Sequence, residues 1–184
     1  MADAADGTEV ITLGGGCFWC LEAVMQQLDG VEAAVPGYAG GQRPNPSYQQ
    51  VCSGATGHAE VVQVSFDPRS LSLTDLLKVF FAAHDPTQLN RQGNDVGTQY
   101  RSVIFWHSEA QRDVARDVIA ALEASGKLSG PVVTELSPAP PFYAAEPYHH
   151  DYFSNNAMQP YCQLVVEPKV MGTRRNFPEL VRRS

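Results

Sequence analysis

Cys17 and Cys20 are the residues with the clearest chemical potential, because they stand three positions apart, directly after three glycines, in the stretch LGGGCFWCLEAV. This spacing is compatible with a redox pair, with half of a zinc site, or with a helix that carries two thiols by chance. A zinc site needs a second pair of ligands at comparable spacing. Cys52 and Cys162 stand alone and the two histidines of YHHDYF are direct neighbours, so zinc is the weaker interpretation.

Cys17 is predicted to be a nucleophile. It opens an amphipathic helix, so unpaired backbone N–H groups and the helix dipole point toward its sulfur. This placement predicts a lowered thiol pKa and a larger thiolate fraction. The alternative is a buried and unreactive thiol, the most common state of cysteine. Cys20 lies one turn further along the same helix, where thioredoxin-like enzymes place the buried partner of the pair.

Candidate acids and hydrogen-bond donors lie elsewhere in the chain. Glu60 stands at the start of an apolar strand, in SGATGHAEVV. Composition alone favours a solvated strand-end carboxylate there, whereas burial would raise its pKa and keep it protonated near neutral pH. Asp95 and Tyr100 belong to NDVGTQYRS, and Tyr48 belongs to NPSYQQVCSG. Isolated tyrosines are usually packing residues with a satisfied hydroxyl group.

Periodicity predicts the elements that position these residues. Alternating or apolar runs indicate strands at 9–15, 31–38, 59–68, 99–107 and 131–138, and QLVVEPKV (163–170) also resembles a strand. Helical spacing is present at 17–28, 73–84 and 109–122, and Ser72 with Asp75 and Ser108 with Gln111 are expected to cap the last two. The order β-α-β-β-α-β at the front predicts an α+β fold of the ferredoxin-like (split βαβ) kind, in two layers.

The segments 38–57 and 86–99 are predicted to be long loops rich in Gly, Pro, Asn and Tyr. Loops of that length are usually functional or disordered, and their embedded aromatic and charged residues favour function. No repeat or change in composition marks a second domain. We therefore expect a single domain over 1–184, with 1–8 and about 173–184 as flexible ends.

Composition excludes several classes of protein. The chain has 184 residues with 43% hydrophobic and 18% charged side chains, which is typical of a globular domain. Its net charge of −7 argues against nucleic-acid binding. It contains no apolar run long enough for a membrane span, and the acidic start MADAADGTEV does not resemble a secretory signal. We expect a cytoplasmic, monomeric protein whose cysteines do not form a structural disulfide framework.

Five segments, in the same order along the chain, resemble the A-type peptide-methionine sulfoxide reductases, which act on the S epimer of the sulfoxide. They are GGGCFWCLEAV, GYAGG, YQQVCSGATGHAEVVQVSFDP, QGNDVGTQYRS and PFYAAEPYHHDYF. The resemblance runs from about Thr12 to Lys169. A GCFWC motif alone would not be specific, whereas five ordered motifs are.

The resemblance implies a role for each matching residue. Cys17 would attack the sulfoxide sulfur, and Glu60 would protonate the sulfoxide oxygen. Tyr48 and Tyr100 would donate hydrogen bonds to that oxygen, and Asp95 would help to shape the site. The residues that match the methyl pocket of the family are Phe18 and Trp19. Aromatic rings suit that task, because sulfur and its methyl group pack well against them.

The implied cycle needs no metal and no organic cofactor. Attack by Cys17 releases methionine and leaves a sulfenic acid, which a second thiol converts into an intramolecular disulfide. Thioredoxin or glutaredoxin would reduce that disulfide by exchange. The implied function is the repair of free or protein-bound methionine sulfoxide under oxidative stress.

The second thiol is a choice between two residues. Many relatives have glycine at the position of Cys20 and a resolving cysteine after a YC dipeptide, which Cys162 matches. Yet the segment after Cys162 is predicted to be a strand and lacks flexible glycines. Cys20 has the local geometry in its favour and Cys162 has the motif, which favours Cys162 slightly. We expect Cys52 to be a buried, non-catalytic thiol.

Two rival functions remain open to test. A general thiol–disulfide oxidoreductase would use Cys17 and Cys20 and would not need Glu60. A zinc or binding module would retain metal and form no sulfenic acid. Neither rival explains the motifs outside the CxxC pair.

Overall fold

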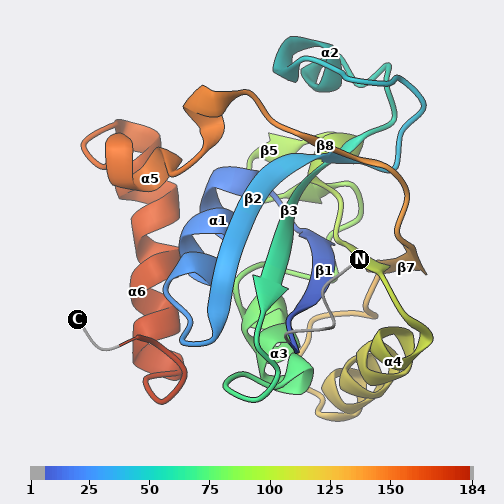
Figure 1. The fold of residues 1–184 in the computed structure, drawn as a ribbon, viewed down its shortest axis with the longest axis vertical. Coiled ribbons are helices and arrows are strands. Elements are labelled where there is room, and N and C mark those ends of the chain that lie inside the picture. The colour runs from blue at the N-terminus through green and yellow to red at the C-terminus, as the bar shows by residue number, and fades with distance from the viewer. Residues whose placement is uncertain (1–6, 183–184) are drawn as a thin grey trace.

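The structure is a computed structural model and describes residues 7–182. Its main element is a six-stranded sheet in the order β7-β6-β1-β3-β2-β8. The strands are β1 (Glu9–Gly14), β2 (Val31–Ala39), β3 (Ala59–Phe66), β6 (Val103–Trp106), β7 (Glu135–Pro138) and β8 (Phe142–Ala144). All neighbouring pairs are antiparallel except β6 and β7. The protein therefore has the mixed α+β fold that the order of elements predicts (Figure 1).

The described chain also contains six α-helices, three short 3-10 or π-helical turns, and the short hairpin of β4 (Arg91–Gln92) and β5 (Asp95–Val96). The helices are α1 (Phe18–Gln26), α2 (Tyr48–Cys52), α3 (Leu73–Ala82), α4 (Glu109–Ala124), α5 (Tyr152–Asn155) and α6 (Glu167–Asn176). Figure 1 shows α6 beside α1 on one flank and α2 projecting beyond the sheet. Among residues 7–182, no helix is long and apolar enough to cross a membrane.

The core is built on both faces of the sheet. On one face, buried strand residues such as Ile11, Val62 and Ile104 pack against α1 and α3. On the other face lies a smaller cluster that includes Val61 and Phe105. Adjacent residues in β3 thus point to opposite faces, as a strand buried on both sides requires. This frame fixes the ends of β1 and β3, where the candidate site lies.

Several predicted boundaries are confirmed. The side chains of Ser72 and Ser108 accept the backbone N–H groups of Asp75 (3.1 Å) and Gln111 (3.2 Å) at the starts of α3 and α4.

Both predicted loops contain some regular structure, since α2 lies within 38–57 and the β4–β5 hairpin within 86–99. Of the segment 131–138, only the second half forms a strand. Of the ends predicted to be flexible, 1–8 and about 173–184, residues 1–6 and 183–184 lie outside the described part of the chain and 173–176 belong to the last helix.

The predicted strand at QLVVEPKV is wrong. Residues 162–166 form a π-helical turn that continues directly into α6. Cys162 and Val166 are buried, whereas Leu164 is 76% exposed, so burial repeats with a helical and not an alternating period. A short apolar run does not separate a strand from a buried helix segment by periodicity. Pro168 lies in the first turn of α6, where proline is tolerated.

Candidate active site

Cys17 lies at the junction of β1 and α1, as the N-cap residue of the helix. The three glycines before it allow the chain to turn where neighbouring atoms leave no room for a side chain. Gly16 has a φ of +83°, and a Cβ atom on Gly15 would lie 2.9 Å from the ring of the buried His84. A Cβ atom on Gly14 would lie 2.9 Å from the carbonyl oxygen of Glu60. The three glycines therefore let the backbone before Cys17 pack directly on Glu60 and His84.

The predicted lowering of the Cys17 pKa is wrong in direction. Cys17 is only 6% exposed, and burial raises its pKa well above the usual value. The carboxyl group of Glu60 and the thiol of Cys20 raise it further, and hydrogen bonds from the Trp19 backbone and Tyr161 lower it less. Desolvation of the thiolate outweighs the helix terminus. The resting sulfur is therefore a thiol at neutral pH.

Glu60 is a buried acid, and the solvated carboxylate that composition favours is not found. Its side chain is 1% exposed. Oε1 accepts the backbone N–H of Phe18 (3.1 Å), and Oε2 accepts a hydrogen bond from Nε2 of Gln99 (2.9 Å). Burial raises the pKa of Glu60 to about 7, although both hydrogen bonds oppose the shift. The group therefore holds a proton over part of the neutral range, as a general acid must.

Phe18, Trp19 and Tyr48 come together in one aromatic cluster with His149. The ring centroids of Tyr48 and Phe18 are 6.2 Å apart, and His149 lies 4.5 Å from Tyr48 and 5.1 Å from Phe18. Nε1 of Trp19 donates a hydrogen bond to Nδ1 of His149 (2.9 Å), and the Trp19 ring stacks on Tyr152 at 3.8 Å. The predicted methyl pocket is thus held by residues from the C-terminal third of the chain.

Tyr100 and Asp95 lie near the nucleophile by different routes. The Tyr100 carbonyl accepts a hydrogen bond from the backbone N–H of Gly16 (3.1 Å). Burial raises the pKa of the Tyr100 hydroxyl group most, and the charges of Glu60 and Cys17 raise it further. Oδ2 of Asp95 accepts a hydrogen bond from the hydroxyl group of Tyr161 (2.8 Å). The first contact ties Tyr100 to the Cys17 junction, and the second ties the β4–β5 hairpin to the C-terminal segment that holds Tyr161.

Two residues of the site were not predicted from the sequence. Gln99 binds Glu60, and Tyr161 lies beside the sulfurs of Cys17 and Cys20, since its hydroxyl group lowers the pKa of both thiols. Gln99 belongs to the QGNDVGTQYRS motif and Tyr161 to the YC dipeptide. Both motifs are recognisable in the sequence, but each points first to the neighbouring residue, Tyr100 or Cys162.

A cavity of about 620 Å³ opens beside Cys17 and Cys20. Its walls come from the β4–β5 segment, including Asp95, and from the C-terminal segment, including Tyr161 and Lys169. Phe18, Trp19, Tyr48 and Glu60 are not part of its lining. Cys17 therefore joins an enclosed aromatic and acidic region to an open cavity that holds the second thiol.

The other cysteines differ in exposure, and none of the four forms a disulfide. Cys20 is 3% exposed and Cys162 is 0% exposed. Burial raises the pKa of Cys20 to about 11, and Lys169 opposes that shift. Cys52 is exposed at the end of α2, so the prediction of a buried thiol is wrong. Cys52 is exposed because α2 is a short helix that projects from the sheet, so its end is not covered by the core (Figure 1).

No group of three or more His, Cys, Asp and Glu side chains within residues 7–182 is arranged to hold a metal ion. His149 is buried and bound to Trp19, and His150 contacts the carbonyl oxygen of Ala145 through Nε2 (2.9 Å). Each histidine thus makes one of these contacts, and the buried Nε2 of His149 has no hydrogen-bond partner among the described residues.

Comparison with known proteins gives consistent matches over nearly the whole chain. A family model described as peptide methionine sulfoxide reductase matches residues 9–180. A peptide methionine sulfoxide reductase MsrA from Polynucleobacter asymbioticus is 56% identical over 173 residues, which cover 94% of this chain and 91% of the relative. The crystal structure of reduced Mxr1 from Saccharomyces cerevisiae is similar with a TM-score of 0.80 and 37% identity, covering 88% of this chain and 92% of Mxr1. A structure of Mxr1 in complex with Trx2 is similar with a TM-score of 0.57 and 27% identity, covering 83% of this chain and 88% of Mxr1.

Proposed function

The chain belongs to the peptide methionine sulfoxide reductase family, and from this premise we propose that it reduces the S epimer of methionine sulfoxide, free or in proteins, to methionine. The observation that carries the proposal is the buried Glu60, whose pKa is about 7, beside the Cys17 thiol. A sulfoxide oxygen must be protonated as its bond to sulfur breaks, and a buried acid of this kind supplies that proton.

In the first step, the sulfur of Cys17 attacks the sulfoxide sulfur while Glu60 protonates the oxygen. The thiol proton of Cys17 replaces the proton that Glu60 gives up, so no net proton is consumed. The S–O bond and the transient S–S bond then break as the protonated oxygen passes to the Cys17 sulfur, so methionine leaves and Cys17 becomes a sulfenic acid. Tyr48 and Tyr100 are assigned as donors to the sulfoxide oxygen, and the influence of Glu60 and Cys17 on the pKa of both hydroxyl groups supports their proximity.

Phe18 and Trp19 are assigned to the methyl group of the substrate. The hydrogen bond from Trp19 to His149 and the stacking on Tyr152 support a preformed wall. Asp95 is assigned to shaping the site through Tyr161. A fixed chiral arrangement of acid, nucleophile and methyl wall accounts for preference for one epimer, because the other epimer would exchange the positions of oxygen and methyl group.

In the second step, we assign Cys20 as the resolving thiol. It lies one helical turn from Cys17, lines the same cavity, and raises the Cys17 pKa by its charge. Cys162 is fully buried within a helical turn, so it would need local unwinding to reach Cys17. Attack of Cys20 on the sulfenic acid forms the Cys17–Cys20 disulfide and releases water.

In the third step, an external dithiol such as thioredoxin reduces the disulfide by exchange. The similarity to Mxr1, which has been solved in complex with Trx2, supports a thioredoxin-type reductant. The cavity gives such a partner access to the two sulfurs. We propose in addition that the protein is a cytoplasmic monomer.

The frame of the site is proposed to be ferredoxin-like. The strands β6, β1, β3 and β2 are adjacent in that order, and α1 and α3 connect them in the chain order β-α-β-β-α-β. This agrees with two interleaved βαβ units.

The proposal is tested with the separate S and R epimers of free L-methionine sulfoxide and with dithiothreitol as reductant. We expect the protein to release methionine from the S epimer and none from the R epimer. Equal turnover of both epimers, or of neither, would contradict the proposal. Reduction of protein disulfides by a Glu60→Gln variant at full rate would instead support a general thiol–disulfide oxidoreductase.

A further inference from the structure

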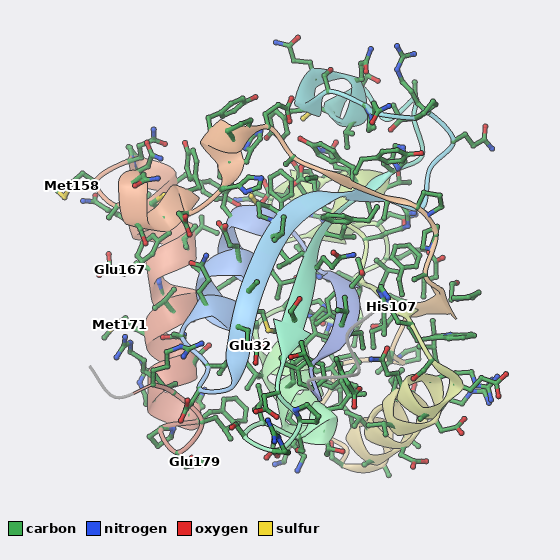
Figure 2. All side chains as sticks on the ribbon, viewed as in Figure 1. Glu32, His107, Met158, Glu167, Met171 and Glu179 are labelled. Atoms are coloured by element: carbon green, nitrogen blue, oxygen red, sulfur yellow. The ribbon has the colours of Figure 1, made fainter. Side chains whose placement is uncertain are left out.

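The helix α6 presents two faces of different character. Glu167 and Met171 are exposed, and Figure 2 shows them on the side of α6 that points away from α1. Lys169 lies two positions after Glu167, about 200° around the helix, and is half-buried. The buried Val166 and Thr173 lie three and four positions from it on the same face. The side chain of Lys169 thus belongs to the face that packs toward α1.

Lys169 and Cys20 line the same cavity beside Cys17. Among the described residues that line this cavity, Lys169 is the only lysine or arginine. No carboxylate within residues 7–182 lies within 4.0 Å of its ammonium group. Its charge is therefore available to the cavity and is not neutralised by an ion pair.

The surroundings of Cys20 contain several other groups that titrate or carry charge. From the segments around the thiol these are Cys17, His84, Asp85, Asp95, Tyr161, Cys162 and Lys169. Burial has the largest influence and raises the pKa of Cys20, and Asp95 and Cys162 raise it less. Lys169 opposes them more than the Tyr161 hydrogen bond does. Lys169 is thus the main group that favours the thiolate form.

We propose that Lys169 is a positioning residue for the recycling step, which stabilises the thiolate of Cys20 as this thiol attacks the sulfenic acid on Cys17. This inference rests on the proposed function, in which Cys20 resolves the sulfenic acid. It adds a residue that acts on the second thiol and not on the sulfoxide.

The step is balanced without a further reagent. Cys20 loses its proton, and its sulfur forms a bond to the Cys17 sulfur as the bond from that sulfur to the hydroxyl oxygen breaks. The leaving hydroxide takes up one proton, so water is the only other product and the disulfide carries both oxidised sulfurs. The positive charge of Lys169 lowers the energy of the attacking thiolate.

The test compares the wild-type protein with Lys169→Met, Lys169→Arg and the matched control Lys127→Met, which removes an equal charge at an exposed site. Each protein, fully reduced, is mixed with S-methionine sulfoxide without reductant. Released methionine reports the attack by Cys17. Acid quenching, alkylation and mass spectrometry report the pairing and rate of the disulfide between pH 6 and 10.

We expect Lys169→Met to release methionine at the wild-type rate and to form the Cys17–Cys20 disulfide roughly tenfold more slowly at neutral pH, as a rise of about one pKa unit would give. The pH at which this rate is half-maximal should rise. Lys169→Arg and Lys127→Met should retain the wild-type profile. Normal methionine release shows that the variant is folded.

Two results would overturn the inference and differ from each other. If the disulfide joins Cys17 to Cys20 but the Lys169→Met profile matches that of the wild type, Lys169 has no role and the proposed function stands. If the disulfide of the wild-type protein joins Cys17 to Cys162, the resolving residue of the proposed function is wrong as well.

Discussion

The two regions that meet at Cys17 differ in their burial and in their access to solvent. Glu60 and the aromatic cluster form a largely buried region in which hydrogen bonds hold the Glu60 carboxyl group and the Trp19 indole. Cys20 and Lys169 instead face an open cavity of about 620 Å³. Oxygen transfer from a small substrate needs a dry site with a protonated acid, whereas exchange with a second protein needs an accessible disulfide. In the proposed function, Cys17 serves both regions as the nucleophile because it lies on their border.

Replacement of Cys17 tests whether both regions depend on one residue, and it should have the largest effect. Cys17→Ser is expected to lower methionine formation by at least about 10⁴-fold, because the attacking atom is lost. Disulfide formation after exposure to sulfoxide should disappear with it. Methionine release and thiol counting check the two outcomes. Retention of either one would mean that the regions work independently.

Replacement of Glu60 tests the enclosed region alone. Glu60→Gln is expected to slow single-turnover methionine release by about 10³-fold, since it removes the proton donor. The wild-type rate should fall above a pH of about 7, where Glu60 loses its proton, and the variant should lack this fall. Rapid-quench measurements across pH 5 to 9 check both. An unchanged profile in the variant would assign the acid to another group.

The same residue links the enclosed region to stability. The folded-state pKa of Glu60 is about 7, above the usual 4.5, so the folded protein binds more protons between these values. Its contribution to stability is complete below pH 4.5 and is lost as the pH rises through 7. The free energy of unfolding of the wild type, relative to Glu60→Gln, should therefore fall by about 3 kcal/mol from pH 4 to 8. Urea unfolding at several pH values measures this, and a constant difference would contradict the buried acid.

Replacement of Cys20 tests the open region. Cys20→Ser should release methionine once at the normal rate, while steady-state turnover with thioredoxin falls by about 10²-fold because an intramolecular thiol is replaced by one from solution. Cys162→Ser should keep wild-type turnover. If the two variants exchange these behaviours, the buried turn that holds Cys162 opens during the cycle.

Much of this arrangement can be predicted from local patterns. The alternation of β3, the caps of α3 and α4, and the glycine run before Cys17 each have a local physical cause, and the structure agrees with them. The C-terminal segment could not be predicted in the same way. Its three-residue apolar run, Leu164–Val166, fits either a strand or a helix, and only packing against α1 decides between them.

The pKa values also depend partly on local features, which the sequence shows, and partly on burial, which it does not. A helix terminus can be found in a sequence, so a lowered pKa for Cys17 was a reasonable prediction. Burial depends on segments that are distant in the chain, and it decides the direction of the pKa shift against the hydrogen bond from Tyr161. For the same reason the burial of Glu60 could not be separated from a solvated strand end until its partners were known.

The burial of Cys17 has a consequence for an enzyme that works where oxidants are abundant. Peroxide attacks thiolates far faster than protonated thiols, and it converts an exposed thiolate stepwise into irreversible acids. Because the resting sulfur of Cys17 is a thiol with 6% exposure, it is a poor target for peroxide. Such a thiol lacks the constant reactivity of a cysteine with a low pKa, and it is less open to the oxidative damage that the enzyme family repairs.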